Sequence, residues 1–143
     1  MPNQDNFQGT MKLQDTLFTI RKISYPNSNT RHGKCKLNLI AQQDGEGDAV
    51  MHTAIPETSL LQMTKECAQN MSHDKYLISS IRQFRIIHPL VPKNVPGIMI
   101  EIHLTPTDKE GTGLVHRMKA VCTRLGGDGR KFFEIAAELS PVK

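Results

Sequence analysis

The sequence has no tryptophan, few other aromatic residues and only three cysteines. Five Phe and two Tyr among 143 residues leave Ile, Leu, Val and Met to build most of a buried core. No stretch approaches the roughly 20 apolar residues of a membrane span. The polar start MPNQDNFQGTMK lacks the apolar segment of a signal peptide. We therefore expect no membrane association, and a disordered tail over residues 1–12.

The cysteines and histidines give little support for a disulfide or a metal site. Cys35, Cys67 and Cys122 are widely spaced and odd in number, which favours free thiols in a reducing, cytoplasmic compartment. The six histidines form no H-x-x-x-H, so the sequence predicts no metal and no cofactor. The net charge of +4 is modest, and basic residues do not alternate with aromatic ones, which argues against a nucleic-acid partner.

One segment, about residues 56–71, has helical periodicity. Pro56 suits the first helical position, where its missing N–H is not needed. Glu57 then lies in the first turn, where a negative charge is favourable to the helix dipole. The spacing predicts one amphipathic helix whose mostly apolar face consists of Leu60, Met63, Thr64, Cys67, Ala68 and Met71.

The remainder of the ordered chain reads as β-strands. Two of these, 17–25 and 34–42, precede the helix, and the others are 76–88, 98–106, 114–125 and 131–139. One helix between two β-rich halves predicts a two-layer α+β domain over residues 13–143. Because one helix covers only part of such a sheet, we expect a second copy of the chain to cover the rest.

Two segments resemble a known family. AIPETSLLQMTKE runs into the helix, and IRQFRIIHPLVPKN follows it. Together with the order strands–helix–strands, they resemble the β-hydroxyacyl-[acyl-carrier-protein] dehydratases of fatty-acid synthesis. The resemblance covers about residues 13–140. It implies a hot-dog fold, an acyl thioester of acyl carrier protein as ligand, and a site built across a dimer interface. The dimer is either a homodimer or a heterodimer with a catalytically competent paralogue.

The family's reactive pair has been replaced in this sequence. With the first motif of the family anchored on Pro56, its catalytic His falls on Asp48, its catalytic carboxylate on Gln62, and the glycine at its helix start on Glu57. Dehydration needs a base for the α-proton and an acid for the departing hydroxyl. A Gln amide exchanges no proton near neutral pH, and an aspartate lacks a pKa near 7. The resemblance therefore implies weak or lost dehydratase activity.

The second motif of the family has a Pro-Val-x-Pro segment. Its match here implies that Pro89, Val91 and Pro92 bind substrate, together with Pro56 and Glu57 of the first motif. Since carrier proteins are acidic, Arg85 and Lys93 are expected to form a basic docking rim. Arg82 and Arg85 have an odd spacing, so they are not expected to face the same side of a regular strand.

Other assignments stay open. His52 lies only four residues before Pro56, so it replaces the missing histidine only if the loop is rebuilt. An active dehydratase with a displaced site would use His52 or Asp48. A hot-dog thioesterase would use Asp48 or Glu66 to activate water. A fourth possibility is a protein without enzymatic activity that has no relation to acyl groups.

Overall fold

The computed structural model describes residues 11–12, 18–24, 31–41, 54–91, 97–108, 114–126 and 129–142. In chain order, the elements are β1 (Met11–Lys12), β2 (Phe18–Ser24), β3 (His32–Ala41), α2 (Glu57–Ser72), β4 (Tyr76–Ile86), β5 (Gly97–Asp108), β6 (Leu114–Arg124) and β7 (Lys131–Pro141). No helix in these ranges is both long and apolar enough to cross a membrane.

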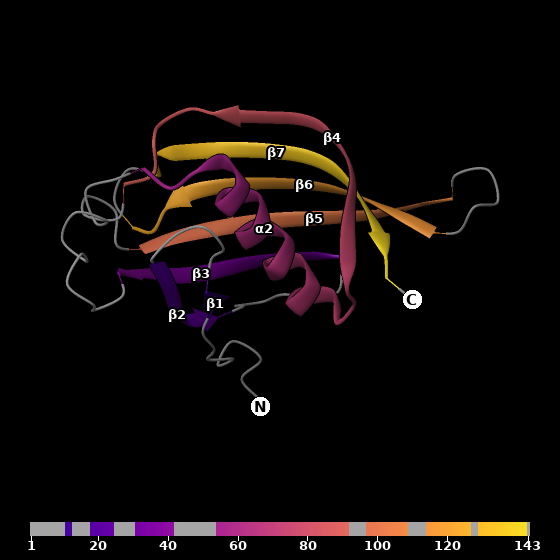
Figure 1. Cartoon of the computed structure of the whole chain (residues 1–143), viewed down its shortest axis with the longest axis horizontal. Helices are drawn as coiled ribbons and strands as arrows, with labels where there is room; N and C mark the ends of the chain where they lie inside the picture. The colour runs from indigo at the N-terminus through magenta and orange to yellow at the C-terminus, as the bar shows by residue number, and fades with distance from the viewer. Residues whose placement is uncertain are drawn as a thin grey trace.

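The strands form one antiparallel sheet, and the helix lies across one of its faces. Within the described ranges, the sheet has seven strands in the order β1-β2-β3-β5-β6-β7-β4. Figure 1 shows α2 running diagonally over the sheet, with β4 at one edge and β1 and β2 at the other. This arrangement confirms the expected α+β class with two layers. It differs from the sequence-based expectation at the N-terminus, because Met11 and Lys12 pair with β2 rather than belonging to a disordered tail.

The helix buries the face that its periodicity predicts. All six residues of the predicted stripe are buried, and Ser59 joins them. The helix begins one residue later than expected, because Pro56 has extended backbone angles (φ −64°, ψ 156°) and is the N-cap. At the other end, His73 adopts a left-handed conformation and donates its N–H to the Gln69 carbonyl at 2.8 Å, closing the last turn.

The sheet turns alternating apolar residues toward the helix. On β5 to β7, alternating apolar residues on the face toward the helix are buried. They are Ile98, Ile100, Ile102, Leu104, Met118, Ala120, Cys122, Phe133, Ile135, Ala137 and Leu139. This burial follows the two-residue period of a strand with one buried face. The sequence did not predict that β3 starts as early as His32, which pairs with His103 of β5.

The edge strand β4 is irregular, and this overturns one expectation. Its pairing with β7 shifts register between Ile78 and Ser80 and again between Ile81 and Gln83. As a result, Arg82 reaches Glu138 and Arg85 reaches Glu134. The two glutamates lie four residues apart on β7, hence on one face. Both arginines therefore lie on the same side of the sheet, because the irregularity inserts a residue into the alternation.

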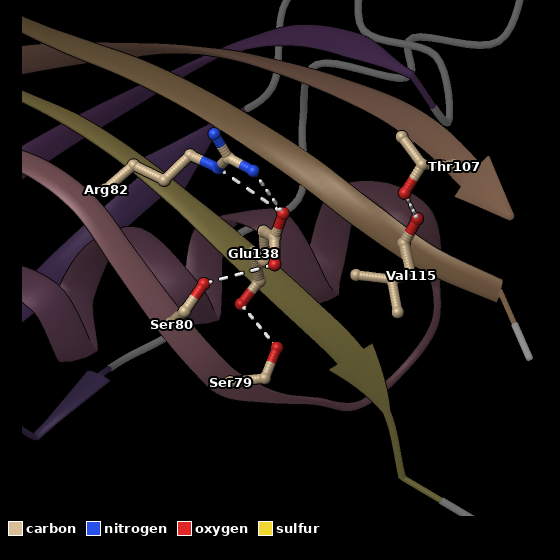
Figure 2. A network of polar contacts seen from close by, with 6 residues as sticks. All are labelled: Ser79, Ser80, Arg82, Thr107, Val115 and Glu138. Carbon is tan, nitrogen blue, oxygen red and sulfur yellow. Dashed lines mark hydrogen bonds and ion pairs between the residues drawn. The ribbon is translucent and has the colours of Figure 1, made fainter. Parts of the chain in front are cut away.

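Glu138 is a charged residue held in the outer face of the sheet. Its side chain is only 9% exposed and receives hydrogen bonds from Arg82 Nη2 at 3.0 Å and Ser80 Oγ at 3.1 Å. Ser79 Oγ also donates to the Glu138 carbonyl at 3.1 Å. Figure 2 shows these groups converging from β4 onto β7. These hydrogen bonds connect the edge strand β4 to β7. They also offset the free-energy cost of burying the Glu138 carboxylate, which would be high without such partners.

We expect Arg82→Ala to lower the free energy of unfolding by about 1–3 kcal/mol, because it removes a charged donor from a nearly buried carboxylate. Arg85→Ala is a matched control on the same strand and face. Arg85 is 63% exposed and 3.8 Å from Glu134, and such surface pairs contribute about 0–1 kcal/mol. Urea unfolding followed by circular dichroism measures both. Equal losses in the two variants would show that the Glu138 network adds nothing specific.

Candidate functional site

The N-terminus of α2 is a turn of helix without a side-chain cap. The Pro56 carbonyl accepts the N–H groups of Ser59 at 3.0 Å and Leu60 at 3.1 Å, and Pro56 makes no side-chain capping bond. Glu57 is exposed in the first turn. Because the first amides of a helix have no partner within it, they point outward with partial positive charge. This end of the helix can therefore polarise a carbonyl oxygen.

The segment after β4 lies directly beside this helix end. The Ile55 N–H donates to the Leu90 carbonyl at 2.9 Å, and both side chains are buried. The N–H groups of Ile87 and His88 donate to the Phe132 carbonyl at 2.8 and 3.2 Å. These bonds fix residues 87–91 between the start of β7 and the start of α2. The two segments that carry the family resemblance are thus neighbours in space.

Four of the five predicted substrate-binding residues lie in the part of the chain that the structure describes, and one lies outside it. Pro56, Glu57, Pro89 and Val91 belong to the two segments joined by the bond between Ile55 and Leu90, with Pro89 exposed and Val91 half-buried. Pro92 lies outside the described residues. The sequence did not single out Ile55 or Leu90 as the residues that join the segments, although both are apolar residues next to a proline of the motif.

Gln62 stands on the helix with a carboxylate as its partner. Its Nε2 donates to Glu66 Oε2 at 3.1 Å, and both residues are half-buried. The bond joins residues four apart, which are neighbours on a helix surface. At the position where the family would have its carboxylate, this chain therefore presents an amide that donates hydrogen bonds and transfers no proton.

The remaining residues expected at the site lie outside the part of the chain that the structure describes. These are Asp48 and His52, which the sequence offers as replacements for the histidine, and Lys93 of the docking rim. Arg85, the other residue of that rim, is described and largely exposed, with Glu134 as a distant partner. Since that pair is long, the Arg85 guanidinium stays accessible to an acidic partner.

The three thiols gather in the core rather than at the helix N-terminus. Cys67 on α2 donates a hydrogen bond to Cys35 Sγ on β3 at 3.0 Å, and Cys122 on β6 is also buried. The hydrogen bond to Cys35 and burial raise the pKa of Cys67, and burial raises the pKa of Cys122. A raised pKa keeps the thiol form, which is a poor nucleophile. This supports a packing role for these cysteines.

We expect none of the three thiols to react with iodoacetamide at neutral pH while the chain is folded. Burial blocks access, and the raised pKa values of Cys67 and Cys122 suppress the thiolate. In denaturant, all three should be alkylated at the rate of an ordinary cysteine. Mass spectrometry of the intact chain counts the labels. Fast labelling of Cys67 without denaturant would contradict the buried arrangement.

Comparisons with known proteins agree with the fold and say nothing about activity. No protein-family model and no curated protein matches the chain. A solved structure of similar fold is the crystal structure of an uncharacterized protein from Erwinia carotovora subsp. atroseptica. The two chains are 14% identical, the similarity covers 95% of this chain and 98% of that one, and the TM-score is 0.51. At that identity the likeness concerns the fold alone.

Proposed function

We propose that this chain is a hot-dog-fold protein that binds β-hydroxyacyl thioesters of acyl carrier protein and has weak or no dehydratase activity. The observation that carries the proposal is the hydrogen bond from the Ile55 N–H to the Leu90 carbonyl at 2.9 Å. It holds together the two segments that resemble the dehydratase family. In such a site, a helix N-terminus polarises the thioester carbonyl.

The residues at the start of α2 favour binding of an acyl group over its dehydration. The helix N-terminus offers amide dipoles to a carbonyl oxygen. Glu57 adds a negative side chain in the same turn, which opposes the enolate-like charge of a dehydration transition state. Gln62 can hold a substrate hydroxyl by hydrogen bonds but cannot protonate it as it leaves. A ground-state acyl group is therefore accommodated better than the transition state.

A mass-spectrometric assay with a β-hydroxyacyl-carrier protein tests the proposal. We expect the acyl-carrier protein to bind and its mass to stay unchanged over minutes. Loss of water at a turnover near the typical ~10 per second would contradict the weak activity. In that case His52→Ala and Asp48→Ala would identify which residue of a displaced site supplies the base.

Thioester hydrolysis is a second candidate, favoured by one contact. The Gln62 amide holds the half-buried Glu66 carboxylate at 3.1 Å, and an oriented carboxylate can activate water. In the same assay, hydrolysis would release the free acid and leave the unacylated carrier protein, with no enoyl product. Loss of that release in Glu66→Gln would assign the role to Glu66.

Electrostatic docking of the carrier protein is tested separately. Carrier proteins are acidic, so Arg85 and Lys93 are proposed to steer them toward the site. NMR titration with acyl-carrier protein is expected to show binding that weakens as salt is raised, and that weakens further in Arg85→Glu and Lys93→Glu. Arg82→Glu is not a suitable control, because Arg82 supports Glu138. Binding that responds neither to salt nor to these variants would remove the docking rim while leaving the fold intact.

A further inference from the structure

Three metal-ligating side chains converge on the face of the sheet opposite to the helix. His32 on β3 pairs directly with His103 on β5, and Glu101 precedes His103 by two residues. Residues two apart on a strand share a face, and directly paired residues are neighbours across strands. Cys35, Ile100 and Ile102, which alternate with these residues, are buried in the core. The backbone register therefore brings His32, Glu101 and His103 together on the outer face.

The distances among the three groups are close to those of a coordination shell. Glu101 Oε2 lies 2.8 Å from His32 Nε2 and 3.6 Å from His103 Nε2. All three ligand atoms lie within 4.8 Å of one another. Ligands held at about 2.0–2.1 Å around a tetrahedral ion are separated by about 3.3 Å. Changes in these separations of a few tenths of an ångström to about 1.5 Å are thus enough to place one ion between the three groups.

The three side chains are partly exposed at the surface of the sheet. Their exposed fractions are 43% for His32, 38% for Glu101 and 55% for His103, so solvent and ions reach them. The imidazole rings are stacked, with centroids 4.1 Å apart and planes inclined by 17°. The χ2 torsion of histidine is broad, so rotation about it can change the direction in which each Nε2 atom points.

The carboxylate is in the right charge state for a cation. Glu101 offers a carboxylate oxygen, which carries negative charge at neutral pH as in an ordinary glutamate. In the absence of an ion, His32 Nε2 and Glu101 Oε2 are hydrogen-bonded to each other at 2.8 Å, and a metal ion bound between them would replace that bond. Lys34 lies across from Glu101, and Lys119 across from His103. These two cations moderate the affinity of the site but occupy no ligand position.

We propose that His32, Glu101 and His103 form a binding site for a divalent transition-metal ion such as Zn²⁺. Two imidazoles and one carboxylate suit borderline ions of this class, whereas Mg²⁺ and Ca²⁺ prefer shells made entirely of oxygen. The three protein ligands leave the rest of the shell to water or to an exogenous ligand. The ion would bridge β3 and β5, and any ion that binds only the folded chain raises its stability.

This site is separate from the helix N-terminus. Its residues lie on the outer face of β3 and β5. The proposed thioester-binding site is instead formed by the start of α2 and the segment after β4. Glu101 and His103 lie two residues apart on one strand. His32 comes from a distant part of the sequence and joins them only through the pairing of β3 with β5.

Calorimetric titration of the untagged, EDTA-treated chain with Zn²⁺ tests the proposal. We expect saturable binding of one ion per chain and a raised unfolding temperature. His32→Ala, His103→Ala and Glu101→Gln should each weaken binding at least ~10- to 100-fold. His88→Ala is the matched control, since His88 is an exposed histidine of another segment, and it should leave binding unchanged.

A second measurement locates the ion without relying on loss of function. Co²⁺ is expected to broaden the imidazole NMR signals of His32 and His103 and to leave that of His88 sharp. The proposal is overturned if the folded chain shows no saturable uptake up to about 1 mM Zn²⁺. It is equally overturned if binding persists in the triple variant or if Co²⁺ broadens a different set of histidines.

Discussion

Asp48→His combined with Gln62→Glu is expected to raise turnover of a β-hydroxyacyl thioester by a factor of ~100 or more. The two substitutions restore the histidine and the carboxylate at the positions where the resemblance places the reactive pair. Either one alone leaves proton transfer incomplete, because dehydration needs one group to remove the α-proton and another to protonate the hydroxyl. The gain should therefore appear only in the double variant.

The surroundings of Gln62 favour this outcome. Its side chain points to Glu66, with Nε2 and Oε2 3.1 Å apart. A carboxylate introduced at position 62 would lie beside a second carboxylate, and the repulsion between like charges raises the pKa of one of them. A carboxyl group with a raised pKa is a better general acid near neutral pH. Glu66→Gln added to the double variant should lower the gain, because it removes that repulsion.

The measurement is loss of water from the β-hydroxyacyl-carrier protein, followed by mass spectrometry. Circular dichroism of each variant establishes that it is folded. A folded double variant as inactive as the starting chain would show that position 48 does not correspond to the family's histidine. Activity in Gln62→Glu alone would instead point to a histidine that the chain already has, and His52→Ala would then test it.

The helix and the strands could be predicted from the sequence because each buries one face at its own period. Met63 and Cys67 repeat at helical spacing, while Ile98 and Ile100 repeat at strand spacing. All four are fully buried. In the sequence, one of the two resembling segments contains the start of the helix and the other contains the end of β4. Their contact through Ile55 and Leu90 is a backbone hydrogen bond, which no side-chain pattern specifies.

The features that the sequence did not predict depend on long-range register. The irregular pairing of β4 puts Arg82 and Arg85 on one face, and no residue type in this strand marks the extra residue. The group of His32, Glu101 and His103 exists because β3 begins at His32 and pairs with β5. Periodicity fixes which face a residue occupies within its own strand. It does not fix which residue of another strand stands opposite.

The edge strand β4 is proposed to pair with a second copy of the chain. Within the described residues, β4 pairs with β7 alone, so its other edge has unpaired backbone groups. The large exposed apolar side chains of the described part are Leu77, Ile81, Ile86, Leu125 and Val142, and three of these lie on β4. An exposed apolar edge strand is a template for pairing with another chain. We therefore expect a homodimer with a mass of twice 16.0 kDa at micromolar concentration.

Ile81→Lys is expected to convert this dimer into a monomer of 16.0 kDa, because a lysine would bring charge into the apolar centre of the paired edge. Leu125→Lys is the matched control, since Leu125 is an exposed apolar residue outside β4, and it should leave the dimer intact. Light scattering over a range of concentrations measures both. A wild-type chain that is monomeric at micromolar concentration, or equal dissociation of the two variants, would exclude pairing through β4. If the acyl site is shared across this edge, Ile81→Lys should also abolish binding of the acyl-carrier protein.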